Sequence, residues 1–315
     1  MLTTNTLRYS ASKAARAFVL YAGLSRILCI FNSQPRILMF HGTGTPDFPA
    51  EAFRAQLSFL SQYYRIVPLG EVCQSIGTHR EARPRVALTF DDGLRNNFMT
   101  AYPILREFRV AATFFVCPGL INSRRWLWNH ECRARLWWMS VENRNRYAKR
   151  LGLETYDVEQ ILLKLKYTAQ ATRVEHERII REMTVDFRPT EEQHHRYDLM
   201  SWEELKAMDR NFVEIGGHST NHHILTQLND NQLASEVGEC KNWLENELCR
   251  KVPHFCYPDG AYDTRVVSCV GKHFELAVTT NAGWVPPQPS ILELPRIPIA
   301  DNLVDLAWRM QRPGS

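Results

Sequence analysis

Two short segments of the chain concentrate residues that can bind a metal ion. Asp91 and Asp92 directly follow an apolar run, and His218 and His222 stand four residues apart in a second segment. Adjacent carboxylates at the end of a strand point in different directions, so one can bind a metal while the other stays free. Two imidazoles that face one point complete a facial triad with that carboxylate, and its open positions suit Zn²⁺, Fe²⁺, Co²⁺ or Ni²⁺. The neighbouring His223 is expected only to cap the loop.

A third segment, residues 255–260, contains a rigid turn. Pro258 and Gly260 restrict the backbone directly after another apolar run. Such a turn can present a backbone N–H towards an oxyanion. Taken alone, the segment is an ordinary β-turn.

Apolar runs of strand length alternate with amphipathic helical patterns along the chain. The predicted strands are 36–41, 65–68, 85–90, 111–116, 212–216, 253–257, 274–279 and 294–299. One helix is predicted directly after Pro49, and a short one begins at the capping box 201–204. Three further helices are predicted at 97–108, 233–248 and 264–270. This alternation favours βα units around a mainly parallel sheet or barrel. The metal-binding segments follow predicted strands, at the end where α/β barrels collect their catalytic residues.

The alternation is interrupted by a charged, helix-prone stretch with a Trp-rich start. We therefore expect a helical N-terminal segment at 1–33, a barrel formed by 34–119 and 200–302, a helical insertion at 120–199, and a C-terminal tail at 303–315. The insertion's four tryptophans could stack on sugar rings while nearby arginines meet phosphate, but a small core of the insertion's own is the preferred interpretation. These residues are Trp126, Trp128, Trp137 and Trp138, with Arg124, Arg125, Arg133 and Arg135. A second metal site could be formed by His194, His195 and Asp198, but a solvated loop is the preferred interpretation of this stretch.

Composition limits the class of protein. The 315 residues include 38 basic and 34 acidic side chains, a net charge of +4 that does not argue for nucleic acid. Eight cysteines without a CxxC pair favour reduced thiols and hence the cytoplasm. The apolar stretch 16–31 is interrupted by Arg26 and falls short of a membrane span. This segment is expected to be a helix that packs outside the main domain, and the alternative is an interfacial helix at a membrane surface. The sequence does not indicate the oligomeric state.

The three segments, in this order, resemble the motifs of the polysaccharide deacetylase family, also called the NodB-homology or carbohydrate esterase 4 family. The resemblance covers roughly 36–116 and 201–299. It implies a distorted (β/α)₇ barrel in which Asp91 is the general base and Asp92, His218 and His222 hold a metal. It further implies that the backbone N–H of Asp259 helps to stabilise the oxyanion while an acetyl group is removed from an amine.

The chain departs from the family pattern in three places. Cys256 stands where the third motif usually has an arginine, the fourth motif is not recognisable in 275–284, and 292–299 lacks the histidine of the fifth. The general acid is therefore not identified by the resemblance. Our hypothesis is that His41 at the end of the first strand is the acid and that Arg296 is the positive charge beside Asp91. A core histidine and a surface ion pair are the respective alternatives.

These observations predict a hydrolase that removes N-acetyl groups from an amino sugar in a polysaccharide, an oligosaccharide or a lipid-linked precursor. One divalent metal ion is expected, Zn²⁺ before Co²⁺ or Ni²⁺. The alternatives are a deformylase or other amide hydrolase with the same metal site, and a carbohydrate-binding protein that has lost activity. We expect action in the cytoplasm, at the membrane face if the N-terminal helix binds there.

Overall fold

The computed structural model describes residues 33–74 and 83–312. The helical segment expected at 1–33 lies outside these residues except for its last position. Within the described ranges, none of the helices is both long and apolar enough to cross a membrane.

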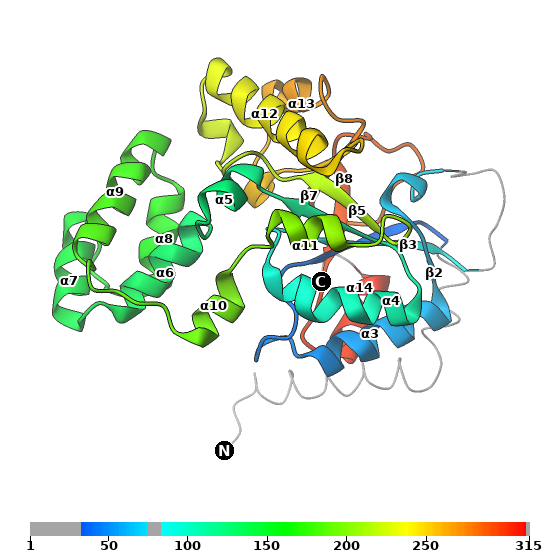
Figure 1. The fold of residues 1–315 in the computed structure, drawn as a ribbon, viewed down its shortest axis with the longest axis horizontal. Helices are drawn as coiled ribbons and strands as arrows, with labels where there is room; N and C mark the ends of the chain where they lie inside the picture. Colours follow the sequence, from blue (N-terminus) through cyan, green and yellow to red (C-terminus); the bar gives the residue numbers. More distant parts are fainter. Residues whose placement is uncertain (1–32, 75–82, 313–315) are drawn as a thin grey trace.

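Seven parallel strands form a closed barrel at the centre of the protein (Figure 1). They are β1 (Arg36–Phe40), β3 (Arg85–Phe90), β4 (Ala112–Val116), β5 (Val213–Gly217), β6 (His254–Cys256), β7 (Leu276–Ala282) and β8 (Leu294–Pro298). The ring closes because β1 pairs with β3 on one side and with β8 on the other. The predicted parallel (β/α)₇ barrel is thereby confirmed.

A short eighth strand accounts for the distortion of the barrel. β2 (Arg65–Ile66) pairs with the first two residues of β3, whereas β4 pairs with the last two. The ring is therefore split between β3 and β4 at the end where the strands begin. The next pair in the ring, β4 and β5, shows no such split, because these strands are paired along their full lengths.

The side chains of the strands alternate between two apolar cores. Phe40, Phe90 and Phe114 belong to the core between strands and helices, and their rings stack with centroids 4.8 and 4.7 Å apart. Ile37 and Ala87 belong to the second core, inside the barrel. Since successive side chains of a strand point to opposite faces, the residues that follow Phe40 and Phe90, namely His41 and Asp91, fall on the inner face at the mouth of the barrel.

Helices cover the outside of the barrel. They are α3 (Ala50–Tyr63), α4 (Tyr102–Phe108), α5 (Pro118–Ser123), α11 (Trp202–Ala207), α12 (Asp230–Leu248), α13 (Thr264–Val270) and α14 (Leu303–Gln311). Helix α14 corrects the expectation of a C-terminal tail at 303–315. Leu306 and Met310 are fully buried, and the Asn302 side chain caps the helix by accepting a hydrogen bond from the Asp305 N–H (3.0 Å). Apolar residues spaced three and four apart make this stretch an amphipathic helix rather than a tail.

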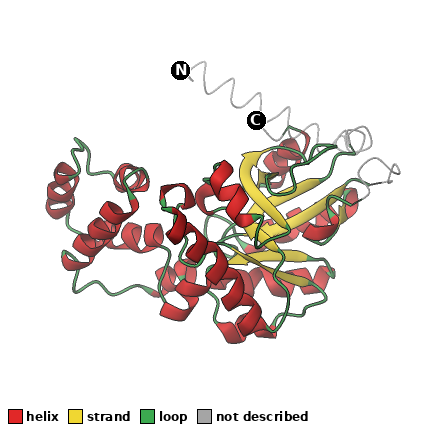
Figure 2. Ribbon diagram, turned by 90° about the horizontal axis from the view of Figure 1, so that it is seen from above, coloured by secondary structure: helices red, strands yellow, loops and turns green. Residues whose placement is uncertain are grey.

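The insertion forms a helical unit beside the barrel (Figure 2). Its helices are α6 (Trp128–Trp138), α7 (Val141–Arg150), α8 (Val158–Lys166), α9 (Gln170–Glu182) and α10 (Glu191–Tyr197), and most of them share a separate apolar core. Trp128 belongs to that core, whereas Trp137 and Trp138 are 59% and 49% exposed. Trp126 is half-buried outside this core and donates to Asp198 at 2.7 Å. The preferred interpretation of the four tryptophans therefore holds for Trp128 and fails for the other three.

Two remaining expectations for the insertion are settled by geometry. The stretch with His194 and His195 is helix α10 and not a loop, because Thr190 and Gln193 form a capping box at its start. His194 pairs with Asp198 (3.0 Å) while His195 contacts the Gly44 carbonyl (2.9 Å), so these residues do not converge on one metal position.

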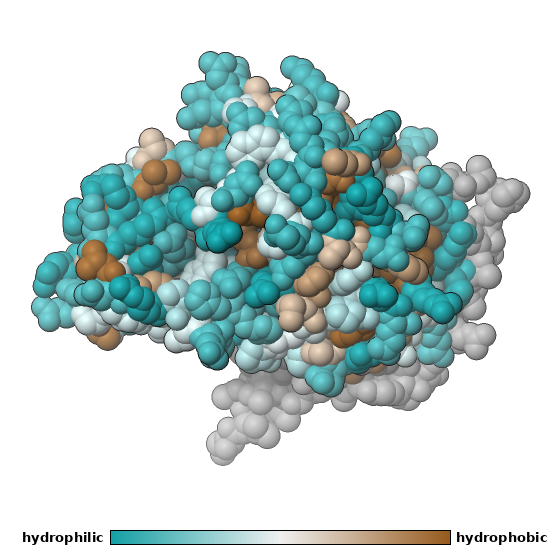
Figure 3. Space-filling model, in the orientation of Figure 1, coloured by the Kyte–Doolittle hydropathy of each residue, from teal (hydrophilic) through white to brown (hydrophobic). Residues whose placement is uncertain are grey.

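The surface seen in Figure 3 is mainly hydrophilic. Over the described residues in this view, apolar side chains occur in small separate groups and not as one continuous patch. Scattered apolar residues of this kind are usual on protein surfaces.

Candidate metal centre and active site

Asp92, His218 and His222 meet at the mouth of the barrel. The Oδ1 atom of Asp92 lies 3.4 Å from Nε2 of His218 and 3.3 Å from Nε2 of His222. All three side chains are buried, and their candidate ligand atoms lie within 4.8 Å of one another. His218 donates from Nδ1 to the Cys256 carbonyl at 2.8 Å, which leaves its Nε2 free to bind a metal.

Left-handed backbone conformations bring these side chains together. Asp92, Ser219 and His222 have φ values of 71°, 59° and 57°. Such conformations are costly for residues other than glycine and concentrate at functional sites. The chain therefore turns sharply after β3 and again after β5, and His222 reaches the metal position from a tight loop.

The loop after β5 is fixed by a buried carboxylate outside the trio. Glu236 of α12 accepts hydrogen bonds from the backbone N–H and the side-chain amide of Asn221 (2.9 and 2.7 Å) and pairs with His223 at 3.0 Å. His223 is thus directed away from the metal ligands, in keeping with the loop role expected for it.

Asp91 faces a different partner from its neighbour Asp92. The guanidinium of Arg296 donates to both of its carboxylate oxygens at 2.7 Å, and the two residues are 3% and 0% exposed. Burial raises the pKa of Asp91, but the charges of Arg296 and His41 lower it below its usual value. The alternative of a surface ion pair for Arg296 is excluded by this burial.

Arg296 is held in place by further contacts from three strands. It donates to the Thr279 carbonyl (2.7 Å) and to Thr89 Oγ1 (3.0 Å), and its Nη2 lies 3.2 Å from Cys256 Sγ. The family pattern has an arginine at the position of Cys256. Here Arg296 of β8 supplies the positive charge instead, and the small Cys256 side chain leaves room for its guanidinium.

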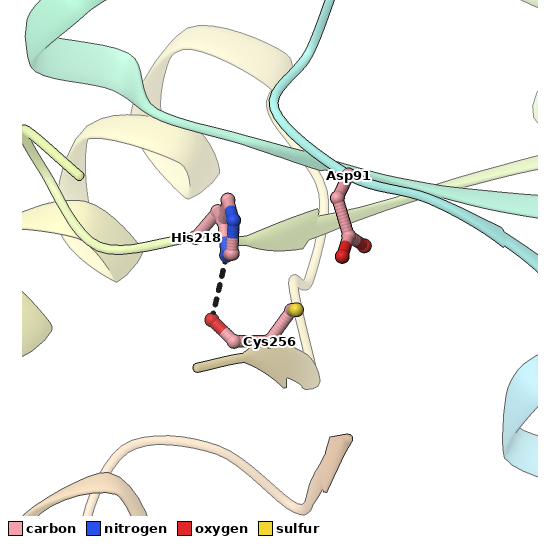
Figure 4. Close-up of side chains that lie close together, drawn as sticks. All are labelled: Asp91, His218 and Cys256. Carbon is pink, nitrogen blue, oxygen red and sulfur yellow. Dashed lines mark hydrogen bonds between the residues drawn. The ribbon is translucent and has the colours of Figure 1, made fainter. Parts of the chain in front are cut away.

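A second group of donors, Asp91, His218 and Cys256, also lies close together (Figure 4). The dashed line in Figure 4 is the bond from His218 to the Cys256 carbonyl. The thiol stands at the end of β6 and the carboxylate directly after β3, two strands that β4 and β5 separate in the barrel. Both Asp91 oxygens already bond Arg296, and burial raises the pKa of the Cys256 thiol. Because metal binding needs a thiolate, the Asp92 trio is the better candidate.

His41 directly follows β1 at the same mouth and is exposed. Its exposure excludes the alternative of a core histidine. Burial raises the pKa of Asp92, whereas hydrogen bonds from His218 and His222 and the charges of His222 and His41 lower it. His41 therefore lies close enough to both aspartates for its charge to act on them.

Asp259 lies in the turn after β6, within the short helix Pro258–Gly260. Its φ is 55°, and Gly260 follows at 65°. A Cβ at Gly260 would approach Thr280 Oγ1 to 1.8 Å, so only glycine fits there. The Asp259 carboxylate pairs with Lys166 of α8 at 2.7 Å, which links this turn to the insertion.

Two residues near the site carry no sequence signal that would have identified them. One is Lys166, and the other is His130 of α6, whose ring stacks on Tyr197 with centroids 4.8 Å apart. Burial lowers the pKa of His130 to about 4, while the charge of Asp92 raises it. The Nδ1 atom of His130 is buried without a hydrogen-bond partner. Both residues lie in the insertion, far in sequence from the motifs.

The mouth of the parallel barrel thus carries a buried Asp–His–His trio beside an ion-paired aspartate. The sequence model of the polysaccharide deacetylase family matches residues 78–273, which is more than half of the chain. The protein belongs to the polysaccharide deacetylase family.

The chain is also similar to other proteins in sequence and in fold. YxkH of Bacillus subtilis (strain 168), whose name places it among the polysaccharide deacetylases, is 19% identical over 278 residues, covering 86% of this chain and 74% of its own. The structure of the Streptococcus pyogenes deacetylase PplD in complex with acetate matches with a TM-score of 0.60, 19% identity and coverage of 90% of this chain and 98% of that one. IcaB from Ammonifex degensii matches with a TM-score of 0.58, 17% identity and coverage of 89% and 97%. These structures share the fold.

Proposed function

We propose that this protein is a metal-dependent N-deacetylase acting on an amino sugar within a polysaccharide, an oligosaccharide or a lipid-linked precursor. Family membership supports the reaction class. The observation that carries the proposal is the separation of two carboxylates at one barrel mouth. Asp92 faces two histidines and Asp91 faces Arg296, so binding and base chemistry fall to different residues.

The donor set fits Zn²⁺. Zn²⁺ binds imidazole nitrogen and carboxylate oxygen at about 2.0–2.2 Å, and tetrahedral ligands at that distance lie roughly 3.3–3.6 Å apart. The separations of 3.3 and 3.4 Å from Asp92 to the histidines agree with this spacing. Bound there, a divalent ion would acidify a water molecule and polarise the carbonyl of an amide.

Asp91 is proposed to accept the proton of the attacking water. The two bonds from Arg296 keep the carboxylate ionised and in one orientation, and each oxygen still has a lone pair available. The backbone N–H of Asp259 is proposed to donate to the oxyanion that forms as the water adds.

His41 is proposed to protonate the leaving amine nitrogen. We expect His41→Ala to abolish acetate release from an N-acetylglucosamine oligosaccharide while hydrolysis of 4-nitrophenyl acetate continues, because nitrophenolate leaves without a proton. Metal content, measured by elemental analysis, should be unchanged. Equal activity of His41→Ala and wild type on the oligosaccharide would remove His41 from the mechanism.

Product analysis separates the proposal from its rivals. The protein is incubated with N-acetylglucosamine and N-formylglucosamine oligosaccharides, and acetate and formate are quantified. Acetate release supports the deacetylase, and formate alone indicates a deformylase. Saturable binding of both oligosaccharides without either product would favour a carbohydrate-binding protein that has lost activity.

A further inference from the structure

The insertion contacts the barrel directly at the turn that carries Asp259. Lys166, the last residue of α8, places its Nζ atom 2.7 Å from Oδ1 of Asp259. The two side chains are 33% and 19% exposed, so the contact is partly shielded from water. Solvent-exposed ion pairs contribute little to stability. Any larger effect of this pair must therefore come from the loop conformation that it holds.

The Asp259 backbone needs support in its observed conformation. A left-handed conformation is unfavourable for residues that carry a Cβ atom, though less so for Asp than for most, and Asp259 at φ 55° is followed by the left-handed Gly260. The second carboxylate oxygen of Asp259, Oδ2, is buried and has no hydrogen-bond partner. Lys166 is thus the cation in direct contact with this carboxylate, and the more distant charge of Arg173 also acts on it.

Lys166 is itself anchored to a second barrel loop. Its carbonyl accepts a hydrogen bond from Gln227 Nε2 (3.0 Å), in the loop that follows His222. Gln227 Oε1 in turn accepts from Arg173 Nη1 of α9 (3.3 Å), and Arg173 is fully buried above the Trp128 ring. The ends of α8 and α9 are therefore bonded to the loops after both β5 and β6.

We propose that Lys166 is a positioning residue for the reaction. Its ammonium holds the Asp259 carboxylate, and through it the left-handed backbone that aims the Asp259 N–H at the developing oxyanion. The inference rests on the proposed function, and it makes the helical insertion a working part of the active site.

Three variants test this role. Lys166→Met removes the charge, Lys166→Arg keeps it, and Lys164→Met is the matched control because Lys164 is exposed on the same helix. Removing an oxyanion donor costs about 10²–10³ in kcat. Misplacing one should cost less, so we expect roughly a tenfold loss of kcat in Lys166→Met with KM nearly unchanged.

The loss should occur with both the N-acetylglucosamine oligosaccharide and 4-nitrophenyl acetate, because both reactions form an oxyanion. Lys166→Arg should recover most of the activity, and Lys164→Met should match wild type. In an Asp259→Asn background, Lys166→Met should cause no further loss, since the carboxylate through which it acts is gone. Wild-type kcat in Lys166→Met would overturn the inference.

A measurement independent of turnover completes the test. Hydrogen exchange of the peptide that spans 257–262 should be faster in Lys166→Met than in wild type and unchanged in Lys164→Met. Equal exchange in Lys166→Met and wild type overturns the inference whether or not the protein releases acetate. Faster exchange with unchanged kcat also overturns it, because the contact would then stabilise the turn without serving the reaction.

Discussion

The two adjacent aspartates differ in their partners, and this difference defines the site at the scale of single residues. Asp91 is paired with a fully buried guanidinium, whereas Asp92 faces two imidazoles. A buried ion pair is strongly destabilised when one member is removed, because an uncompensated charge is left behind. Arg296 should therefore matter for folding as well as for catalysis.

We expect Arg296→Met to lower the free energy of unfolding by about 3–5 kcal/mol, as is typical when a buried pair is broken. Arg95→Met is the comparison, because Arg95 pairs with Glu204 at 2.7 Å but its side chain is 50% exposed. That change should cost less than about 1 kcal/mol. Urea denaturation of both variants gives the answer, and similar losses would mean that the Asp91–Arg296 pair has no special energetic role.

Spacing along the chain predicted that Asp92, His218 and His222 would meet, because His218 and His222 are four residues apart and Asp92 follows a strand. Arg296 could be proposed only from the closure of a barrel, which places the last strand near the first. Lys166 and His130 could not be predicted. Lys166 meets Asp259 from 93 positions away, and no pattern in the insertion marks either residue.

At the scale of elements, the strand ends and the loops that follow them determine what faces the mouth. Alternation along β3 places Asp91 inside the barrel, and left-handed residues turn the next loop back towards the site. The strands were predictable because buried parallel strands are continuous apolar runs. The helix predicted at 97–108 begins instead with a π-helical turn, Asn97–Ala101, where Asn97 and the preceding Asn96 bond Thr43.

The insertion depends on a charge cluster between α6 and α9. Glu131 accepts hydrogen bonds from Arg135 (3.0 Å) and from two nitrogens of Arg181 (2.9 Å each). Burial raises the pKa of Glu131, but the two arginines lower it to about 2. A carboxyl with a depressed pKa stabilises the folded state above its ordinary value, and this contribution is lost as the pH falls towards the depressed value.

The stability difference between wild type and Glu131→Gln should therefore be largest above about pH 5 and shrink as the pH falls to about 2.5. Thermal unfolding across this range measures it. Glu142→Gln, at an 83% exposed side chain of α7, should differ little from wild type at any pH. A difference for Glu131→Gln that does not change with pH would show that the cluster does not depress this pKa.

At the scale of the whole molecule, closure of the barrel joins the two ends of the described chain. β1 lies between β3 and β8, and Arg36 of β1 donates to the Met310 carbonyl of α14 at 3.0 Å. Helix α14 packs on α3 within the main core. The last helix is therefore part of the structure that holds β1, and with it His41, in place.

We expect Leu306→Ala to lower the free energy of unfolding by about 2–5 kcal/mol, the usual cost of a large-to-small change at a fully buried site. Asp301→Ala, at an exposed position just before the helix, should change it by less than about 0.5 kcal/mol. Equilibrium denaturation compares the two. A small effect of Leu306→Ala would mean that α14 is dispensable to the core.

The account as a whole depends on a metal ion at Asp92, His218 and His222 that acetate release requires. The most direct measurement is acetate release from an N-acetylglucosamine oligosaccharide by chelator-treated protein as Zn²⁺ is added back. We predict no release without metal and a rise that saturates near about one ion per chain, as one facial triad requires. The same curve is expected for His223→Ala, and no response for His222→Ala. Full acetate release by the metal-free protein, or none with Zn²⁺, Co²⁺ or Ni²⁺ present, would contradict the account.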